Sequence, residues 1–166
     1  MNQDNITAGG RGEIIENLRS FVHSIWTNGP LHGIAQWDRV YDNGQKLLTD
    51  EVHPIVVGLF AYCHDACRLN DGHDVRHGAR AAEWIKKLRN TYLKDISDED
   101  FELLRKACEL HTITHKTGNP TIDACFDADR LDLWRVGITP DPKRLATEKG
   151  KEIARNTDYT PLLYNW

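Results

Sequence analysis

Apolar residues recur along most of this chain at the three- and four-residue spacing of helices that bury one face. The clearest case is the segment from Gly12 to Trp26, which Asn28-Gly29-Pro30 then ends. The other predicted helices cover about residues 33–48, 54–65, 75–92, 97–111 and 122–135, and a short basic helix is expected over 143–154. No segment has the alternating pattern and turn residues of a β-hairpin. The pattern therefore predicts an all-α fold.

The helix that begins at Pro54 is apolar along its whole length and ends in the ionisable pair His64-Asp65. Burying an imidazole and a carboxylate at the end of a core helix costs several kcal/mol unless something compensates them. A bound cation is the most economical compensation. The pair therefore predicts a metal site.

Length and composition limit the architecture. The chain has 166 residues, of which 40% are hydrophobic, so it is long enough for one well-buried core and too short for two ordinary domains. We expect one domain over residues 1–166, built as a compact bundle of about six to eight helices. Residues 139–166 are predicted to pack on it as a C-terminal tail.

Charge and hydropathy exclude several classes of partner. The net charge is −4 and the basic residues are scattered, so we expect no nucleic acid polymer as a partner. The longest apolar run falls short of the roughly 18 residues that span a bilayer, and the segment Met1-Asn2-Gln3-Asp4 has no signal-peptide pattern. A cytoplasmic protein with no membrane partner is expected, and the four cysteines, which form no CxxC pair, are interpreted as thiols.

Further metal-binding side chains are found downstream. Asp129 lies in an acidic segment over 127–132, on a predicted helix whose other face is apolar. His73 and His77 are four residues apart, as are His111 and His115, which places each pair on one face if the helix extends that far. Mixed histidine and carboxylate ligation suits Mn²⁺, Fe, Co²⁺, Ni²⁺ or Zn²⁺ better than Mg²⁺.

These residues resemble a known family. The pair His64-Asp65 at the end of an apolar helix, the upstream Trp37-Asp38-Arg39-Val40 and the downstream Asp127-Ala128-Asp129-Arg130-Leu131-Asp132 are similar to the HD-domain superfamily of metal-dependent phosphohydrolases. The resemblance covers roughly residues 31–137. It implies that His64 and Asp65 are the central metal ligands and that Asp129 is the distal one.

The resemblance also implies that His77 and His111 hold a second ion, with Asp65 bridging the two. The chain departs from the family at the usual first ligand, a histidine, where it has Gln36. Three explanations stay open: His32, one turn earlier, replaces it; Gln36 offers a weaker carbonyl oxygen; or the site is impaired. A second departure is Arg68 where some members carry a helper acid, a role that Asp71 or Asp74 could take.

The implied reaction is hydrolysis of a phosphate ester of a small metabolite or nucleotide by metal-activated water. Asp65, Arg68 and Arg130 are the expected catalytic residues, and Arg68 and Arg80 are expected to bind the substrate phosphate. Three alternatives remain: a mixed-valent di-iron oxygenase, a ligand-binding module with a degenerate metal site, and a helical protein whose histidines and acids merely pair with one another. The pattern leaves the oligomeric state open, a homodimer included.

Overall fold

The computed structural model describes residues 6–164, so the first residues, on which the signal-peptide argument rests, lie outside it. The described elements are α1 (Ala8–Ile25), η1 (Pro30–His32), α2 (Ile34–Lys46), α3 (Pro54–Cys63), α4 (His77–Lys87), α5 (Asp98–Leu110), α6 (Pro120–Arg130), η2 (Leu133–Val136), η3 (Pro142–Arg144), α7 (Glu148–Asn156) and α8 (Thr160–Tyr164). These residues contain eight α-helices and no strand. The predicted all-α bundle of six to eight helices is confirmed.

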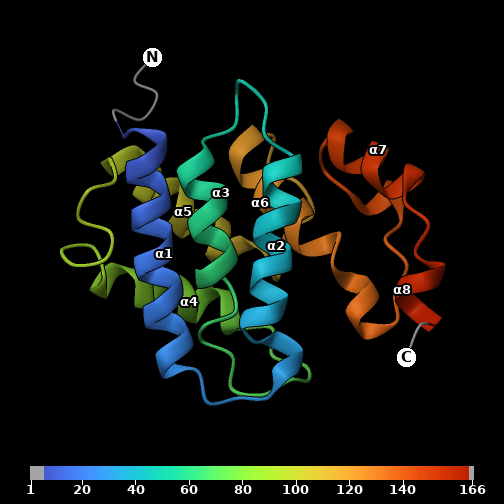
Figure 1. The fold of residues 1–166 in the computed structure, drawn as a ribbon, viewed down its shortest axis with the longest axis horizontal. Coiled ribbons are helices and arrows are strands. Elements are labelled where there is room, and N and C mark those ends of the chain that lie inside the picture. The colour runs from blue at the N-terminus through green and yellow to red at the C-terminus, as the bar shows by residue number, and fades with distance from the viewer. Residues whose placement is uncertain (1–5, 165–166) are drawn as a thin grey trace.

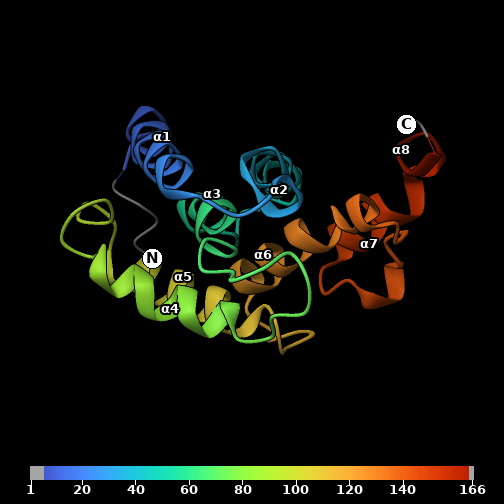
Figure 2. The same ribbon diagram turned by 90° about the horizontal axis from the view of Figure 1, so that it is seen from below.

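The apolar helix α3 lies at the centre of the fold. It packs against α1 and α2 on one side and against α5 and α6 on the other, while α4 covers α5 (Figures 1 and 2). Every residue from Ile55 to Cys63 is buried, which is why this helix has no polar face. The C-terminal end of α3, where His64 and Asp65 follow, is therefore surrounded by other helices.

Two predicted helices end earlier than their apolar pattern suggested. The helix expected over 75–92 is confined to α4. Asp74 accepts hydrogen bonds from the Leu69 N–H and from Arg80 and so holds the preceding residues in a loop, and after Lys87 the side chain of Arg89 donates to the carbonyls of Leu93 and Ile96 and holds the following residues in turns. The helix expected over 122–135 ends at Arg130. The chain then turns to bring the buried Asp132 to Arg39, whose Nε lies 2.8 Å from Oδ1.

The C-terminal segment lies at one end of the molecule, beyond α2 and α6 (Figures 1 and 2). The basic helix expected over 143–154 is replaced by η3 and α7, because Thr147 caps α7 through its hydroxyl and the residues before it are extended. The carboxylate of Asp127 on α6 accepts the N–H groups of Ala146 and Thr147 at 2.8 Å each and the Thr147 hydroxyl at 2.7 Å. These bonds attach the segment to the bundle.

None of the described helices combines the length and the apolar character needed to cross a bilayer.

Candidate metal centre

The structure gathers six polar side chains, predicted from separate parts of the sequence, around the carboxylate of Asp65. They come from the ends of elements: His32 from η1, Gln36 from the first turn of α2, His64 from the C-cap of α3, His77 from the start of α4, His111 from the C-cap of α5 and Asp129 from the last turn of α6. His32, Gln36, His64, Asp65 and His77 are buried. The cluster thus has the composition of a metal site inside the fold.

The two oxygens of Asp65 face different sets of neighbours. Oδ2 lies 3.2 Å from Nδ1 of His32 and 3.5 Å from Nε2 of His64. Oδ1 lies 2.8 Å from Nε2 of His77 and 3.9 Å from Nε2 of His111. A carboxylate with separate partners on each oxygen has the geometry of a bridge between two ion positions.

Hydrogen bonds to the backbone fix the tautomers of three imidazoles. Nδ1 of His64 contacts the carbonyl of Phe60 at 2.9 Å, Nδ1 of His77 contacts that of Asp74, and Nδ1 of His111 contacts that of Cys108 at 2.6 Å. A carbonyl only accepts, so each Nδ1 carries the proton. With an ion bound, each ring would be neutral and would direct the Nε2 lone pair into the cluster, as in histidines that bind metals.

The Nε2 atoms of His77 and His111 lie 2.9 Å apart. Two lone pairs at this distance repel each other unless a proton or a cation lies between them. Nε2 of His64 is buried with no hydrogen-bond partner among the described residues. This nitrogen, together with the facing nitrogens of His77 and His111 beside the Asp65 carboxylate, fits a bound cation.

The distances within the cluster match those between ligands of one ion. A metal–ligand distance of about 2.1 Å separates adjacent ligand atoms by about 3.0 Å in an octahedron and by about 3.4 Å in a tetrahedron. Around the first position, Nε2 of His64 lies 3.5 Å from Oδ2 of Asp65 and 3.5 Å from Oδ1 of Asp129. Around the second, Nε2 of His77 lies 2.8 Å from Oδ1 of Asp65 and 2.9 Å from Nε2 of His111.

The charges of the cluster favour a positive charge at its centre. Burial lowers the pKa of His64, but the charges of Asp65 and Asp129 outweigh this effect and raise it to about 9. Burial likewise raises the pKa of Asp65, yet the His64 charge and hydrogen bonds from neighbouring imidazoles hold it well below its ordinary value. The carboxylates therefore attract a cation to the point where the ring nitrogens meet.

Both residues considered for the first ligand lie at the cluster. His32 contacts Asp65, and Nε2 of Gln36 lies 3.5 Å from Oδ1 of Asp129. The other amide atom of Gln36, Oε1, is buried without a partner among the described residues. A half-turn of this amide exchanges its oxygen and nitrogen, so Gln36 is able to present a carbonyl oxygen beside Asp129.

The close approach of α4 to α5 brings His77 and His111 together. A Cβ atom at Gly78 would lie 2.5 Å from the backbone oxygen of Cys108. The same carbonyl accepts the hydrogen bond from Nδ1 of His111. Only glycine permits this approach, because the atom it would meet belongs to the backbone.

A cavity of about 270 Å³, which we call the cluster cavity, opens over Asp65, His77, His111 and Asp129. The predicted Arg68 lines it and donates from Nε to Oδ1 of Asp65 at 3.2 Å. Arg135 lines it as well, with Nη2 3.8 Å from Oδ1 of Asp129. The cavity therefore holds two guanidinium groups beside the proposed ligands.

Arg130 and Arg80 are not in the cluster cavity, so their placement does not support their expected roles as a catalytic residue and a phosphate ligand. Arg130 donates to Asp127 and to the carbonyl of Thr114. Arg80 donates to Asp74 and to the carbonyl of Cys67. Each satisfies a local carboxylate and a loop carbonyl.

Arg135 was not predicted as a site residue, because the apolar pattern predicts one helix over 122–135. In such a helix a residue six positions after Asp129 points away from it. The turn that follows Arg130 brings Arg135 back. Of the two acids considered as helpers, Asp74 lines the cluster cavity and bonds Arg80, whereas Asp71 is exposed.

Comparison of the chain with protein family models, with curated proteins and with solved structures gives no match. The function is therefore argued from the geometry of the cluster and its cavity.

Proposed function

We propose that this chain is a metal-dependent phosphohydrolase that cleaves a phosphate ester of a small metabolite or nucleotide. The observation that carries the proposal is the pair of Nε2 atoms of His77 and His111, 2.9 Å apart and directed at each other beside Asp65. The resemblance of the His64-Asp65 pair and the acidic segment to the HD-domain superfamily supports the same reaction.

The ligands divide into two sets that share Asp65. His64, Asp65 and Asp129 would hold the first ion, with His32 and Gln36 beside them; Asp65, His77 and His111 would hold the second. Nitrogen and carboxylate donors suit Mn²⁺, Fe, Co²⁺, Ni²⁺ or Zn²⁺. When bound, such an ion supplies a hydroxide nucleophile at neutral pH and withdraws charge from a phosphoryl oxygen.

The guanidinium groups of Arg68 and Arg135 contribute binding and orientation. Guanidinium groups donate to phosphoryl oxygens in a planar geometry, and they stabilise the negative charge that these oxygens carry in the transition state. Arg135 is suited to this role because it is only 8% exposed and its Nε has no partner among the described residues. A phosphoryl group would compete with Asp65 for Arg68.

The cluster cavity limits the size of the substrate portion that reaches the ions. A volume of about 270 Å³ lies at the lower end of small-molecule sites. It accommodates a phosphoryl group with a short organic part and excludes a folded partner.

A di-iron oxygenase is the second candidate, because six of these residues could ligate two iron ions: His32, His64, Asp65, His77, His111 and Asp129. The two arginines favour an anionic substrate such as a phosphate ester, which is why hydrolysis is placed first. A binding module with a degenerate site is the third candidate, and Gln36 in place of the family's histidine is its support.

The test is to load the purified, untagged chain with each of the five metals, remove the excess and measure bound metal, phosphatase activity and oxygen uptake. We expect one or two ions per chain and hydrolysis of a small phosphate monoester. His64→Gln and His111→Gln should lose metal, while His115→Gln, exposed and one turn beyond His111, should retain it. Arg135→Gln should keep the metal and lose activity.

Each alternative gives a different result. Iron at two per chain with oxygen uptake would favour the oxygenase. Bound metal without turnover of any substrate would favour the binding module. No metal in the wild type after reloading would refute the metal-dependent reaction altogether.

A further inference from the structure

A second and larger cavity lies on the outer face of α4, next to the loop that follows α3. Its volume is about 710 Å³. We call it the α4 groove, and it is lined by Cys67, Arg68, Leu69, Arg76, Ala79, Arg80, Glu83, Trp84 and Lys87. The residues from Arg76 to Lys87 follow one another at three- and four-residue steps, so they form one stripe of the helix. Arg68 lines both the α4 groove and the cluster cavity.

The α4 groove carries an excess of positive charge. Its four basic side chains face one carboxylate, Glu83, which pairs with Lys86. Arg68 and Arg80 are bonded to Asp65 and Asp74 respectively. The side chains of Arg76 and Lys87 have no hydrogen-bond or ion-pair partner among the described residues.

The groove also presents apolar surface. Leu69 is 70% exposed. Trp84 is half-buried, and its ring is stacked against Phe21 at 6.4 Å with an interplanar angle of 9°. This stacking holds the indole in one orientation, so the groove offers a preformed aromatic surface between basic groups.

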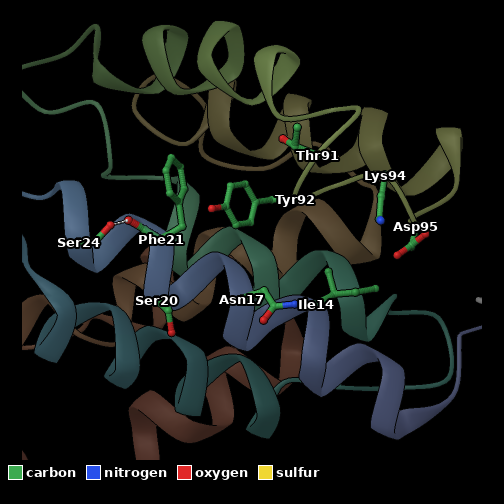
Figure 3. A pocket seen from close by; sticks show the side chains of 9 residues that line it. All are labelled: Ile14, Asn17, Ser20, Phe21, Ser24, Thr91, Tyr92, Lys94 and Asp95. Atoms are coloured by element: carbon green, nitrogen blue, oxygen red, sulfur yellow. Dashed lines mark hydrogen bonds between the residues drawn. The ribbon is translucent and has the colours of Figure 1, made fainter.

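A third cavity of similar size lacks this combination. The α1 cavity, of about 670 Å³, lies between α1 and the turn after α4 (Figure 3). It is lined by polar groups such as Asn17 and Ser20 and by the stacked rings of Phe21 and Tyr92, 4.4 Å apart. Its single cation, Lys94, is balanced by Asp95, which lines the same cavity.

We propose that the α4 groove binds a small anion with a flat aromatic body. Lys87, three residues from Trp84, binds the anionic group, Trp84 packs against the aromatic part, and Arg76 at the other end of the stripe attracts the anion over a longer distance. The volume suits a small molecule rather than a protein segment. The proposal does not depend on the metal, because none of these three side chains belongs to the cluster.

The test uses the full chain stripped of metal, with naphthalene-1-sulfonate as the probe and isothermal titration calorimetry as the measurement. We expect a dissociation constant below about 1 mM. Naphthalene-1-methanol, which lacks the charge, and methanesulfonate, which lacks the ring, should each bind at least about tenfold more weakly.

Variants of the α4 groove and of the α1 cavity show in which of the two cavities the probe binds. The double variant Arg76→Gln/Lys87→Gln, which changes only exposed side chains, should weaken binding about tenfold, and Trp84→Leu should weaken it about fivefold. Lys94→Gln removes the cation of the α1 cavity and should leave binding within about twofold of the wild type.

Three results would overturn the proposal. The first is no binding of the probe to the wild-type chain at millimolar concentration. The second is binding that the double variant does not change. The third is binding lost in Arg135→Gln but kept in the double variant, which would place the probe in the cluster cavity.

Discussion

Asp127 and Asp129 lie two residues apart on α6, yet the structure gives them unrelated surroundings. Asp129 faces the cluster and is 23% exposed, whereas Asp127 is buried against the C-terminal segment. Substitution of each by asparagine keeps the size of the side chain and removes its charge. The pair of variants therefore separates attachment of that segment from metal binding.

The expected loss of stability in Asp127→Asn follows from the hydrogen bonds that the Asp127 carboxylate accepts. Oδ1 accepts the Ala146 N–H, and Oδ2 accepts both the N–H and the hydroxyl of Thr147, at 2.7 to 2.8 Å. Asparagine keeps one oxygen but turns an NH₂ group toward the Thr147 N–H, so one bond is lost and a buried donor is left unpaired. Hydrogen bonds to charged groups contribute about 1.5–3 kcal/mol each. We expect the free energy of unfolding to fall by about 3 kcal/mol and Tm by about 6–12 °C.

Urea titration and thermal unfolding followed by circular dichroism measure this loss. Hydrogen exchange should show faster exchange at Ala146 and Thr147, while bound metal stays at the wild-type level. Asp129→Asn is the matched control: it should lose metal and keep Tm within about 2 °C of metal-free wild type. A loss below about 1 kcal/mol in Asp127→Asn, with unchanged exchange, would refute the reasoning.

Three further predictions concern pH, the contact of α4 with α5, and the first ligand. A hydrogen bond from Arg19 lowers the pKa of Asp38, so this pair stabilises the fold above about pH 4 and the contribution is lost as the pH falls. Because both side chains are about a third or more exposed, urea titration should show a difference between wild type and Asp38→Asn below about 1 kcal/mol at pH 7 that shrinks as the pH falls below about 4; a difference that acid leaves unchanged would contradict this account. Gly78→Ala places a methyl group against the Cys108 carbonyl and should lower the metal content toward one ion per chain; an unchanged content of two ions would show that α4 and α5 tolerate the methyl group. Gln36→His adds an imidazole and should make the chain retain metal at higher chelator concentration, whereas weaker retention would show that the site is built for an amide.

The apolar pattern was sufficient for the core of the fold but not for helix ends. The apolar run after Pro54 identified α3, because a helix buried on every face needs no polar stripe. The ends of α4 and α6 depend on Asp74, which holds a loop, and on Asp132, which pairs with Arg39. The contacts of Asp74 close a short loop, while the contact of Asp132 joins residues 93 positions apart, and the apolar pattern contains neither.

The candidate site was predictable where it rests on single residues and not where it depends on the direction of a side chain. His64, Asp65 and Asp129 were singled out by their position, and the structure brings them together with His77 and His111; their role as ligands stays a prediction. Arginines near them in sequence were a poor guide. Arg130 lies next to Asp129 and turns away from the cluster, while Arg135, six positions on, faces it.

The proposed ligands are spread over residues 32–129 and over six elements, with only His64 and Asp65 adjacent in the chain. No short stretch of an unfolded chain therefore gathers enough donors to hold an ion. Metal binding would thus stabilise the folded state and not the unfolded one. The apolar core around α3 contains none of these ligands except at its end, so an ion would add its stabilisation to that of the core. The concentration of free metal would then act as a graded control on how long each folded molecule survives.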